Sequence, residues 1–298
     1  MSRFAKVVAA ASALALAFGL SACSAGGNEG TPGVDRPVRI GVTNASDPYW
    51  EHYKEATKAQ GIEVELVDFA EYSQPNPALA AGEIDLNEFQ HLIYLAQYNV
   101  SAGDDLTPIG ATAIYPLGLY SQTYKSTDEI PAGSEIAIPN DESNQARALL
   151  VLQQAGLLKL KDGGSPFSSP DDIIAAESKV TVRPIEASLT GTTLPDVAGS
   201  VINQNFLDEA GLKPTDAIAQ DDPNADTAKP YINVFVSRAE DKDNPTYLKL
   251  VEIFQNDKAT TDGLVEHANG AAEPLTTPTA ELLEVLQKTQ ADYEKAGK

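Results

Sequence analysis

Residues 38–69 read VRIGVTNASDPYWEHYKEATKAQGIEVELVDF and contain three predicted elements in succession. The β-branched runs at residues 38–42 and 62–69 indicate two strands. Between them, residues 49–60 have the spacing of apolar side chains that is typical of an amphipathic helix. A strand, a helix and a second strand in this order are typical of parallel β-α-β units. This stretch therefore predicts an α/β fold.

The same alternation of strands and helices continues to the end of the chain. Further strands are predicted at residues 135–138, 180–185, 199–202 and 231–236, and further helices at residues 88–98, 143–160, 247–255 and 280–295. Strands that alternate with helices predict parallel sheets covered by helices on both faces.

Two proline-bearing segments interrupt this pattern. Tyr115 and Pro116 stand between two apolar runs, and residues 220–230 read QDDPNADTAKP. If both segments connect the same two bodies, the chain leaves a first lobe near residue 115 and returns to it near residue 231. The predicted first lobe is then residues 38–115 plus 231–298, and the predicted second lobe is residues 116–230. A two-lobed clamp with two hinge crossovers follows from this arrangement.

The N-terminus has the parts of a secretory signal: positive charge, an apolar run over residues 7–20, and small residues at positions 21 and 22. The apolar run is shorter than the roughly 20 residues of a membrane span. Leu-Ser-Ala-Cys at residues 20–23 resembles the bacterial lipobox, in which the cysteine is acylated with lipid chains such as palmitate and the signal peptide, here residues 1–22, is removed. Because Cys23 is the only cysteine, the alternative of a plain cleaved signal leaves a free thiol without a role.

Residues 23–37 are rich in glycine, serine and proline and are predicted to be a lipidated N-terminus and flexible tether. No second apolar run in the sequence approaches the length of a membrane span. The sequence thus predicts attachment to the lipid bilayer through acylated Cys23, on the extracytoplasmic face of the cell membrane. The net charge of -22 argues against nucleic acid as a partner, because binding to phosphates relies on clustered Lys and Arg.

Sequence signatures of catalysis are mostly absent. The motifs GxSxG, HExxH, CxxC and GxxxxGK followed by Ser or Thr do not occur, and His52, His91 and His267 have no metal-ligand spacing. With 43 acidic residues in the chain, adjacent pairs are expected by chance, so the pairs at residues 104–105, 171–172 and 221–222 are interpreted as solvated surface. The composition favours a binding protein without cofactor or metal over an enzyme. A lipoprotein hydrolase and a surface adhesin are the alternatives from other classes.

One segment carries a family resemblance: residues 68–95 read DFAEYSQPNPALAAGEIDLNEFQHLIYL. It contains a tyrosine before Gln-Pro-Asn, an acidic residue after a glycine, and Phe-Gln-His with a tyrosine three residues on, at Tyr72, residues 74–76, Asp85, residues 89–91 and Tyr94. Further motifs follow at residues 138–141 with Asn144 and Arg147, at residues 201–205 and at residues 231–234. With these motifs in this order, the chain resembles the methionine-binding lipoproteins of NlpA type, the substrate-binding components of ABC amino-acid importers.

The resemblance implies a two-lobed, periplasmic-binding-protein-like clamp of type II. It also implies that the protein captures methionine, L or D, and delivers it to an ABC permease and its ATPase. Some residues depart from the family pattern: Glu88 stands where the family usually has Phe, Gln204 replaces a usual Gly, Phe206 replaces Tyr, and residues 44–50 differ from the common small-residue turn. These departures leave another amino acid or a methionine-containing dipeptide open as the ligand.

An amino-acid zwitterion needs a cation for its carboxylate. Arg147 suits this role because a guanidinium binds a carboxylate through two parallel hydrogen bonds. We expect Arg147 in the first turns of a helix whose N-cap is Asn140 or Ser143, so that helix amides add to the attraction. The alternative is a surface ion pair with Glu142 or Asp141. The resemblance favours the ligand site for Arg147, and it adds Asn144 to that site.

The ammonium group of such a ligand needs hydrogen-bond acceptors. Asn203, Asn205 and Asn233 lie inside or at the ends of predicted strands, where an amide side chain is costly unless it is hydrogen-bonded. Each is predicted to bond the ligand with one end and the backbone with the other. The alternative is a turn or cap role, and it applies most to Asn205.

An aromatic wall for a thioether is predicted from Tyr72, Phe89, His91 and Tyr94, because sulfur packs favourably at aromatic edges. Phe89 and His91 are two residues apart on the predicted helix start, so they face one cleft only if the turn there is irregular. The alternative is core packing with a structural histidine. Trp50, the sole tryptophan, is either a core residue or a lid over the cleft.

Overall fold

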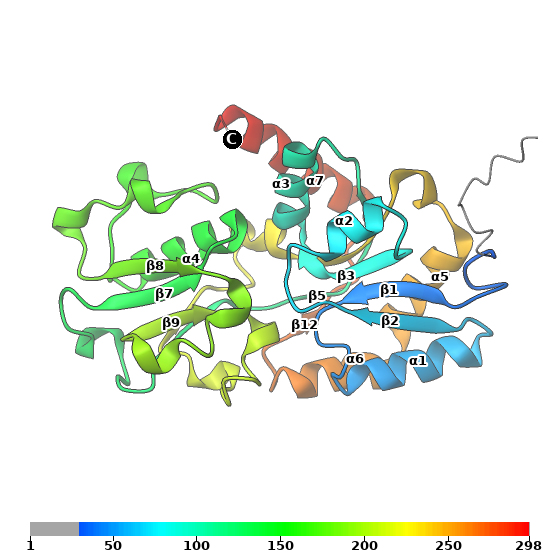
Figure 1. Cartoon of the computed structure of the whole chain (residues 1–298), viewed down its shortest axis with the longest axis horizontal. Helices are drawn as coiled ribbons and strands as arrows, with labels where there is room; N and C mark the ends of the chain where they lie inside the picture. The colour runs from blue at the N-terminus through cyan, green and yellow to red at the C-terminus, as the bar shows by residue number, and fades with distance from the viewer. Residues whose placement is uncertain (1–29, 298) are drawn as a thin grey trace, which may run out of the picture. The chain divides into compact units, whose positions relative to one another are not determined.

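The computed structural model describes residues 30–297, which form two five-stranded sheets and one two-stranded sheet (Figure 1). The predicted signal peptide, residues 1–22, and Cys23 lie outside the described residues. Strands and helices alternate along most of the described chain, so the predicted α/β class is confirmed.

The first sheet has the strand order β2-β1-β3-β11-β4. Its strands are β1 (Val38–Val42), β2 (Val64–Asp68), β3 (Leu86–His91), β4 (Thr107–Ala111) and β11 (Asn233–Ser237). β1 pairs in parallel with β2 and β3, whereas β11 is antiparallel to β3 and β4. The expectation of a wholly parallel sheet is therefore wrong, because β11 enters this sheet only after the chain has built the second one.

Helices cover both faces of the first sheet (Figure 1). On one face, α1 (Tyr49–Ala59), α5 (Pro245–Asn256) and α6 (Lys258–His267) bury their apolar side chains against β1. On the other face lie α2 (Pro75–Ala80), α3 (Leu92–Ala102) and α7 (Thr279–Lys295). Trp50 is 1% exposed among the aromatic side chains of the first group. Of its two predicted roles, Trp50 therefore has the one in the core.

The second sheet has the strand order β10-β6-β9-β7-β8. Its strands are β6 (Gly118–Tyr120), β7 (Glu135–Pro139), β8 (Thr181–Ile185), β9 (Gly199–Ile202) and β10 (Ala219–Gln220). β7 is parallel to β8 and β9, and β6 is antiparallel to β9 and β10. The helix α4 (Glu142–Gln154) packs on this sheet through Ala148, Leu149 and Leu152.

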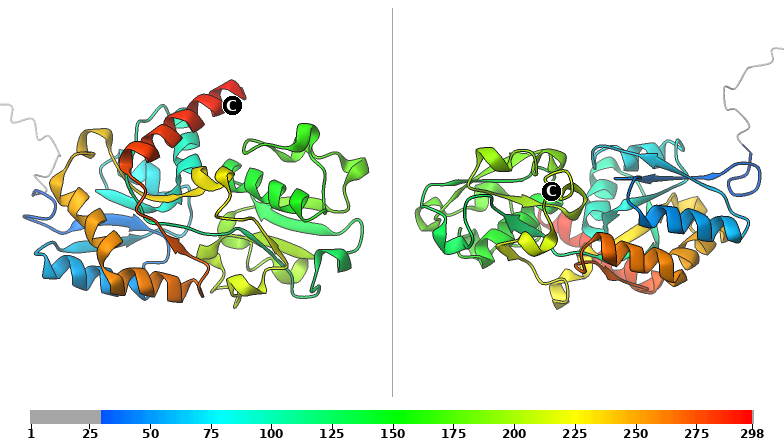
Figure 2. Two further views of the ribbon diagram at one scale, coloured as in Figure 1. Left: turned by 180° about the vertical axis from the view of Figure 1, so that it is seen from behind. Right: turned by 90° about the horizontal axis from the view of Figure 1, so that it is seen from below.

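We call the body around the first sheet the first lobe and the body around the second sheet the second lobe. The chain passes to the second lobe through residues 115–117, after β5 (Ala113–Ile114), and returns through residues 221–232 (Figure 2). The return segment contains the helical turn η9 (Asp226–Tyr231). β5 pairs with β12 (Glu273–Pro274) beside these crossovers.

Two predicted helices have different bounds in the structure. Residues 86–91, partly assigned to a helix from the sequence, form strand β3, and α3 begins at Leu92. β3 lies between β1 and β11 and is mostly buried, so its sequence lacks the alternation that marks a half-exposed strand. The helix expected at residues 143–160 ends at Gln154, because Gly156 follows with a φ of 72°, a conformation that favours glycine and ends the helix.

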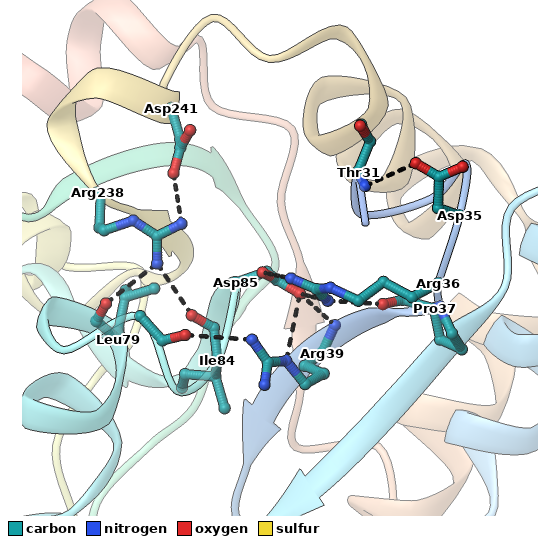
Figure 3. Close-up of polar contacts among 11 residues, drawn as sticks. Thr31, Asp35, Arg36, Pro37, Arg39, Leu79, Ile84, Asp85, Arg238 and Asp241 are labelled. Atoms are coloured by element: carbon teal, nitrogen blue, oxygen red, sulfur yellow. Dashed lines mark hydrogen bonds and ion pairs between the residues drawn. The ribbon is translucent and has the colours of Figure 1, made fainter. Parts of the chain in front are cut away.

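Part of the predicted tether is attached to the first lobe, as Figure 3 shows. Residues 31–36 form a turn closed by a bridge between Pro32 and Arg36. The guanidinium of Arg36 donates to both carboxylate oxygens of Asp85, at 2.6 and 2.7 Å, and the backbone N–H of Arg39 donates to the same carboxylate at 2.8 Å. Asp85 is 2% exposed, and Arg36 lowers the energetic cost of burying its charge. Asp85, the acidic residue of the sequence motif, therefore attaches the turn at residues 31–36 to the first lobe.

Candidate ligand-binding site

A cavity lies between the two lobes and is lined by side chains from both. Every residue predicted from the sequence to contact the ligand lines this cavity: Tyr72, Phe89, His91, Tyr94, Asn144, Arg147, Asn203, Asn205 and Asn233. Its other lining residues are Gln90, Tyr115, Pro116, Leu117 and Gln204, none of which was predicted to bind ligand. The cavity measures about 40 Å³, room for about three water molecules. An amino acid can therefore enter only if the lobes separate or the lining side chains move.

Strand β3 explains how Phe89 and His91 reach the same cavity. The register of β3 against β11 shifts at Phe89, between the pairs Gln90–Val234 and Glu88–Phe235, and Phe89, Gln90 and His91 all line the cavity at this irregular point of the strand. The ring centroids of Phe89 and Tyr94 are 5.7 Å apart, and that of Tyr72 lies 5.9 Å from Phe89. These three rings make one apolar wall of the cavity.

Two of the sequence motifs, residues 74–76 and residues 89–91, are hydrogen-bonded to each other next to the cavity. Asn76 donates from Nδ2 to Oε1 of Gln90 at 2.8 Å, and Nε2 of Gln90 donates back to Oδ1 of Asn76 at 2.6 Å. Nδ2 of Asn87 also donates to Oδ1 of Asn76, at 2.9 Å. All three side chains are buried, and this network fixes β3 against the start of α2.

His91 is a neutral imidazole in the cavity. Burial, and then the nearby positive charge of Arg147, lower the pKa of His91 to about 3. Its Nδ1 accepts a hydrogen bond from the backbone N–H of Tyr94 at 3.3 Å, which caps α3. The ring proton is therefore on Nε2, 3.3 Å from Oδ1 of Asn144 in the second lobe. His91 thus connects the two lobes at neutral pH without carrying charge.

Arg147 lies on α4 and is 5% exposed. The N-cap of α4 is Asp141, not the predicted Asn140 or Ser143, since the Asp141 carboxylate accepts from the backbone N–H of Asn144 at 3.0 Å. The ion-pair partner of Arg147 is also different from the two weighed from the sequence. Its Nε and Nη2 donate to the carboxylate of Asp221 at 2.6 and 3.2 Å.

Asp221 was interpreted from the sequence as solvated surface, and that interpretation is wrong. Only 21% of the Asp221 side chain is exposed. Its carboxylate accepts a hydrogen bond from the backbone N–H of Leu117 at 2.8 Å, in addition to those from Arg147. Arg147 further donates from Nη2 to the carbonyl of Tyr115 at 2.8 Å, and its guanidinium carbon lies 4.2 Å from the ring centroid of Tyr231.

The asparagines of the cavity differ in what they leave available. Asn203 follows β9 and donates from Nδ2 to Oδ1 of Asn144 at 2.8 Å, while its own Oδ1 is buried and has no hydrogen-bond partner among residues 30–297. A buried acceptor without a donor is costly unless a bound molecule supplies one. Asn233 starts β11 and pairs with His91 in the sheet.

Asn205 instead joins the lobes. Its Oδ1 accepts from the hydroxyl of Tyr72 at 2.7 Å, its Nδ2 donates to Oγ1 of Thr43 at 3.0 Å, and its backbone carbonyl accepts from Nδ2 of Asn44. Both ends of the Asn205 amide are therefore used by contacts between the lobes, which differ from the turn or cap role that was the alternative.

The family model described as NlpA lipoprotein matches residues 38–276, which include both sheets and the whole lining of the cavity. The chain belongs to the NlpA lipoprotein family. The resemblance predicted from the sequence motifs is thus confirmed. Over 258 residues, the chain is 36% identical to the D-methionine-binding lipoprotein MetQ of Salmonella typhi. The matched region covers 85% of this chain and 92% of the relative.

Solved structures agree with this family and its two-lobed fold. The substrate binding protein of a methionine transporter from Streptococcus pneumoniae has a TM-score of 0.75 and 32% identity, over 80% of this chain and 95% of that chain. A nutrient binding protein from Burkholderia cenocepacia bound to methionine has a TM-score of 0.74 and 34% identity, over 80% of this chain and 99% of that chain. The predicted periplasmic-binding-protein-like clamp is therefore confirmed.

Proposed function

We propose that this protein is an extracytoplasmic substrate-binding lipoprotein that captures methionine between its lobes and delivers it to an ABC permease and its ATPase. The lobes that close on the ligand are residues 38–115 plus 231–298 and residues 116–230. One observation carries the proposal: the cavity combines a cation, an unpaired acceptor and an aromatic wall. These are the partners that an amino acid with an apolar side chain requires.

Arg147 is the group for the ligand carboxylate. The hydrogen bonds of Arg147 to Asp221 and Tyr115 use Nε and Nη2. Among residues 30–297, Nη1 makes no hydrogen bond, so its two N–H groups remain for a carboxylate in the cavity. A charge-assisted hydrogen bond of this kind is stronger than one between neutral groups.

Asn203 is the group for the ligand ammonium. Its free Oδ1 accepts one N–H, and Asn144 holds the amide in place through the bond to Nδ2. The neutral state of His91 adds no positive charge that would repel the ammonium group. The rings of Tyr72, Phe89 and Tyr94 supply the edges against which a thioether packs.

The small size of the cavity indicates how binding proceeds. At about 40 Å³ the space is too small for an amino acid, so the ligand enters when the lobes are apart. The cross-lobe bonds of Asn205 and His91 then form again around it. No covalent step is needed, and we propose binding without catalysis.

The lipid anchor at Cys23 is part of the proposal. It is supported by the lipobox-like sequence at residues 20–23 and by relatives that are named lipoproteins. None of the helices within residues 30–297 is long and apolar enough to cross a bilayer. Acyl chains on Cys23 would then hold the protein at the extracytoplasmic face of the cell membrane.

Calorimetry on ligand-free protein tests the proposed ligand. We expect saturable binding of L- or D-methionine and a higher melting temperature in its presence, since a ligand at a hundredfold excess over Kd stabilises the folded state by about 2.7 kcal/mol. A methionine-containing dipeptide is the second ligand to test, because Gln204 lines the cavity at a position where the family usually has Gly. Glucose serves as the negative control. Absence of binding by every amino acid and dipeptide would contradict the proposed function.

A further inference from the structure

We propose that Asp221 is a positioning residue for the ligand carboxylate: it holds the guanidinium of Arg147 so that Nη1 faces the cavity. This inference rests on the proposed function, because it concerns how Arg147 meets an amino acid. Asp221 spans the guanidinium with both carboxylate oxygens, from Oδ2 to Nε at 2.6 Å and from Oδ1 to Nη2 at 3.2 Å. The geometry is the paired arrangement in which a guanidinium fits a carboxylate best.

The five N–H groups of Arg147 are divided between protein and cavity by this pair. Asp221 takes the N–H of Nε and one N–H of Nη2, and the carbonyl of Tyr115 takes the other N–H of Nη2 at 2.8 Å. The ring of Tyr231 lies against one face of the guanidinium, with 4.2 Å between its centroid and the guanidinium carbon. Among the contacts within residues 30–297, the N–H groups of Nη1 are the donors of the guanidinium that bond neither Asp221 nor Tyr115.

Arg147 needs such a hold because open space lies on more than one side of it. Arg147 lines the ligand cavity and also a second cavity of about 450 Å³, which is lined in addition by Asp221, Leu150 and Ala228. An arginine side chain has several rotatable bonds, and fixing them costs conformational entropy. With Asp221 in place, that cost is met before the ligand arrives.

Asp221 also connects Arg147 to both crossovers between the lobes. Asp221 is the first residue after β10, where the chain starts its return to the first lobe. Its Oδ1 accepts from the backbone N–H of Leu117 at 2.8 Å, in the outgoing crossover. The outgoing and the return crossover are thus joined at the residue that bonds Arg147. Asp221 therefore links the position of the Arg147 guanidinium to the two crossovers between the lobes.

The variant Asp221→Asn tests the inference, with Asp222→Asn as the matched control. Asn keeps the size of the side chain but places an NH2 group against the N–H groups of Arg147, which favours rotation of the guanidinium. Asp222 is the adjacent carboxylate; it is exposed and accepts from the backbone N–H of Asn224 at 2.9 Å. We expect methionine affinity to fall roughly tenfold in Asp221→Asn, equivalent to about 1.4 kcal/mol, and to stay unchanged in Asp222→Asn.

A second measurement separates positioning from a general loss of structure. In ligand-free protein, the Nε–H signal of Arg147 in nitrogen-15 NMR spectra should exchange slowly with water, because Asp221 accepts that bond. We expect this protection to be lost in Asp221→Asn and kept in Asp222→Asn, while the backbone signals of both variants remain those of the folded protein. If Asp221→Asn does not fold, Asp221→Glu replaces it: the charge is kept but displaced by one methylene, and an affinity between those of wild type and Arg147→Ala is expected.

The outcomes distinguish this inference from the proposed function. Wild-type protein that binds no methionine overturns both. Wild-type protein that binds methionine, with a folded Asp221→Asn variant of equal or higher affinity, overturns the positioning role alone. Unchanged protection of the Arg147 Nε–H in folded Asp221→Asn also overturns it, because the guanidinium would then be held by other contacts.

Discussion

The hydroxyl of Tyr72 donates a hydrogen bond to Oδ1 of Asn205 at 2.7 Å, from the first lobe to the second. The ring of Tyr72 also packs on Phe206, with centroids 5.2 Å apart. Tyr72 thus has two roles at once: its ring forms part of the cavity wall, and its hydroxyl joins the lobes. A hydrogen bond of this kind forms only when the lobes meet, so it contributes to the closed state and not to the open one.

We expect Tyr72→Phe to weaken methionine binding about two- to tenfold, because the ring stays while one hydrogen bond worth about 0.5 to 1.5 kcal/mol is lost. Calorimetry measures the change. Tyr98→Phe is the control: the hydroxyl of Tyr98 donates to Asp104 at 2.9 Å within the first lobe, and its loss should leave affinity unchanged. Equal affinity of Tyr72→Phe and wild type would mean that this bond does not contribute to closure.

The first β-α-β unit was predictable from local sequence, and the residues that line the cavity were predicted with the help of the family resemblance. β1, α1 and β2 lie where the apolar pattern of residues 38–69 places them, within two residues at each end. Strand β3 was not predicted as a strand, because it is buried between two neighbours and its sequence does not alternate. The helical pattern that begins at Leu92 was extended backwards over it.

Asp221 shows what local sequence could not reveal. Its partner Arg147 is 74 residues away, and the adjacent acidic pair at residues 221–222 resembles the other acidic pairs of an acidic chain. Only the folded crossovers bring the Asp221 carboxylate within hydrogen-bond distance of Arg147 on α4. In the same way, nothing in the local sequence distinguishes Asn205, whose amide joins the lobes, from Asn203, whose Oδ1 keeps no partner among residues 30–297.

Stability should depend on the protonation of Glu88. Burial raises the pKa of Glu88 to about 7, opposed by a hydrogen bond that its Oε1 accepts from Thr112 Oγ1 at 2.7 Å. The unfolded chain has the ordinary lower pKa, so between roughly pH 4.5 and 7 the folded state binds more protons than the unfolded state. The contribution of Glu88 to the free energy of unfolding therefore falls as the pH rises through this window.

We expect Glu88→Gln to raise the melting temperature at pH 8, where the wild-type carboxylate is charged and buried, and to have a smaller effect at pH 5. Scanning calorimetry at the two pH values gives the difference. Glu65→Gln, on the exposed side of β2, is the control and should shift neither value. A Glu88→Gln variant with the same pH dependence as wild type would show that Glu88 does not titrate in this range.

Membrane attachment should depend on Cys23. We expect Cys23→Ser to move the protein from the washed membrane fraction to the soluble fraction, because the proposed acyl chains would be lost and no helix within residues 30–297 is a candidate membrane span. Fractionation followed by immunoblotting measures this. Ser24→Ala, at the residue after Cys23, should remain with the membrane. Retention of Cys23→Ser in the washed membranes would contradict the anchor.

Arg147 should dominate the affinity for the ligand carboxylate. Removing one partner of a buried charge pair costs on the order of 2 to 5 kcal/mol, so Arg147→Ala should weaken methionine binding by roughly 30-fold or more. Arg147→Lys should give an intermediate affinity, because lysine keeps the charge but cannot span Asp221 and still present two N–H groups to the cavity.

Arg183→Ala is the matched control for these variants. Arg183 pairs with Glu135 at 3.2 Å on the surface of the second lobe and is 41% exposed, so its loss should leave affinity unchanged. Calorimetry on the three variants decides. Unchanged affinity in a folded Arg147→Ala would remove Arg147 from the ligand site and leave its pair with Asp221 as a purely structural link between α4 and the crossovers.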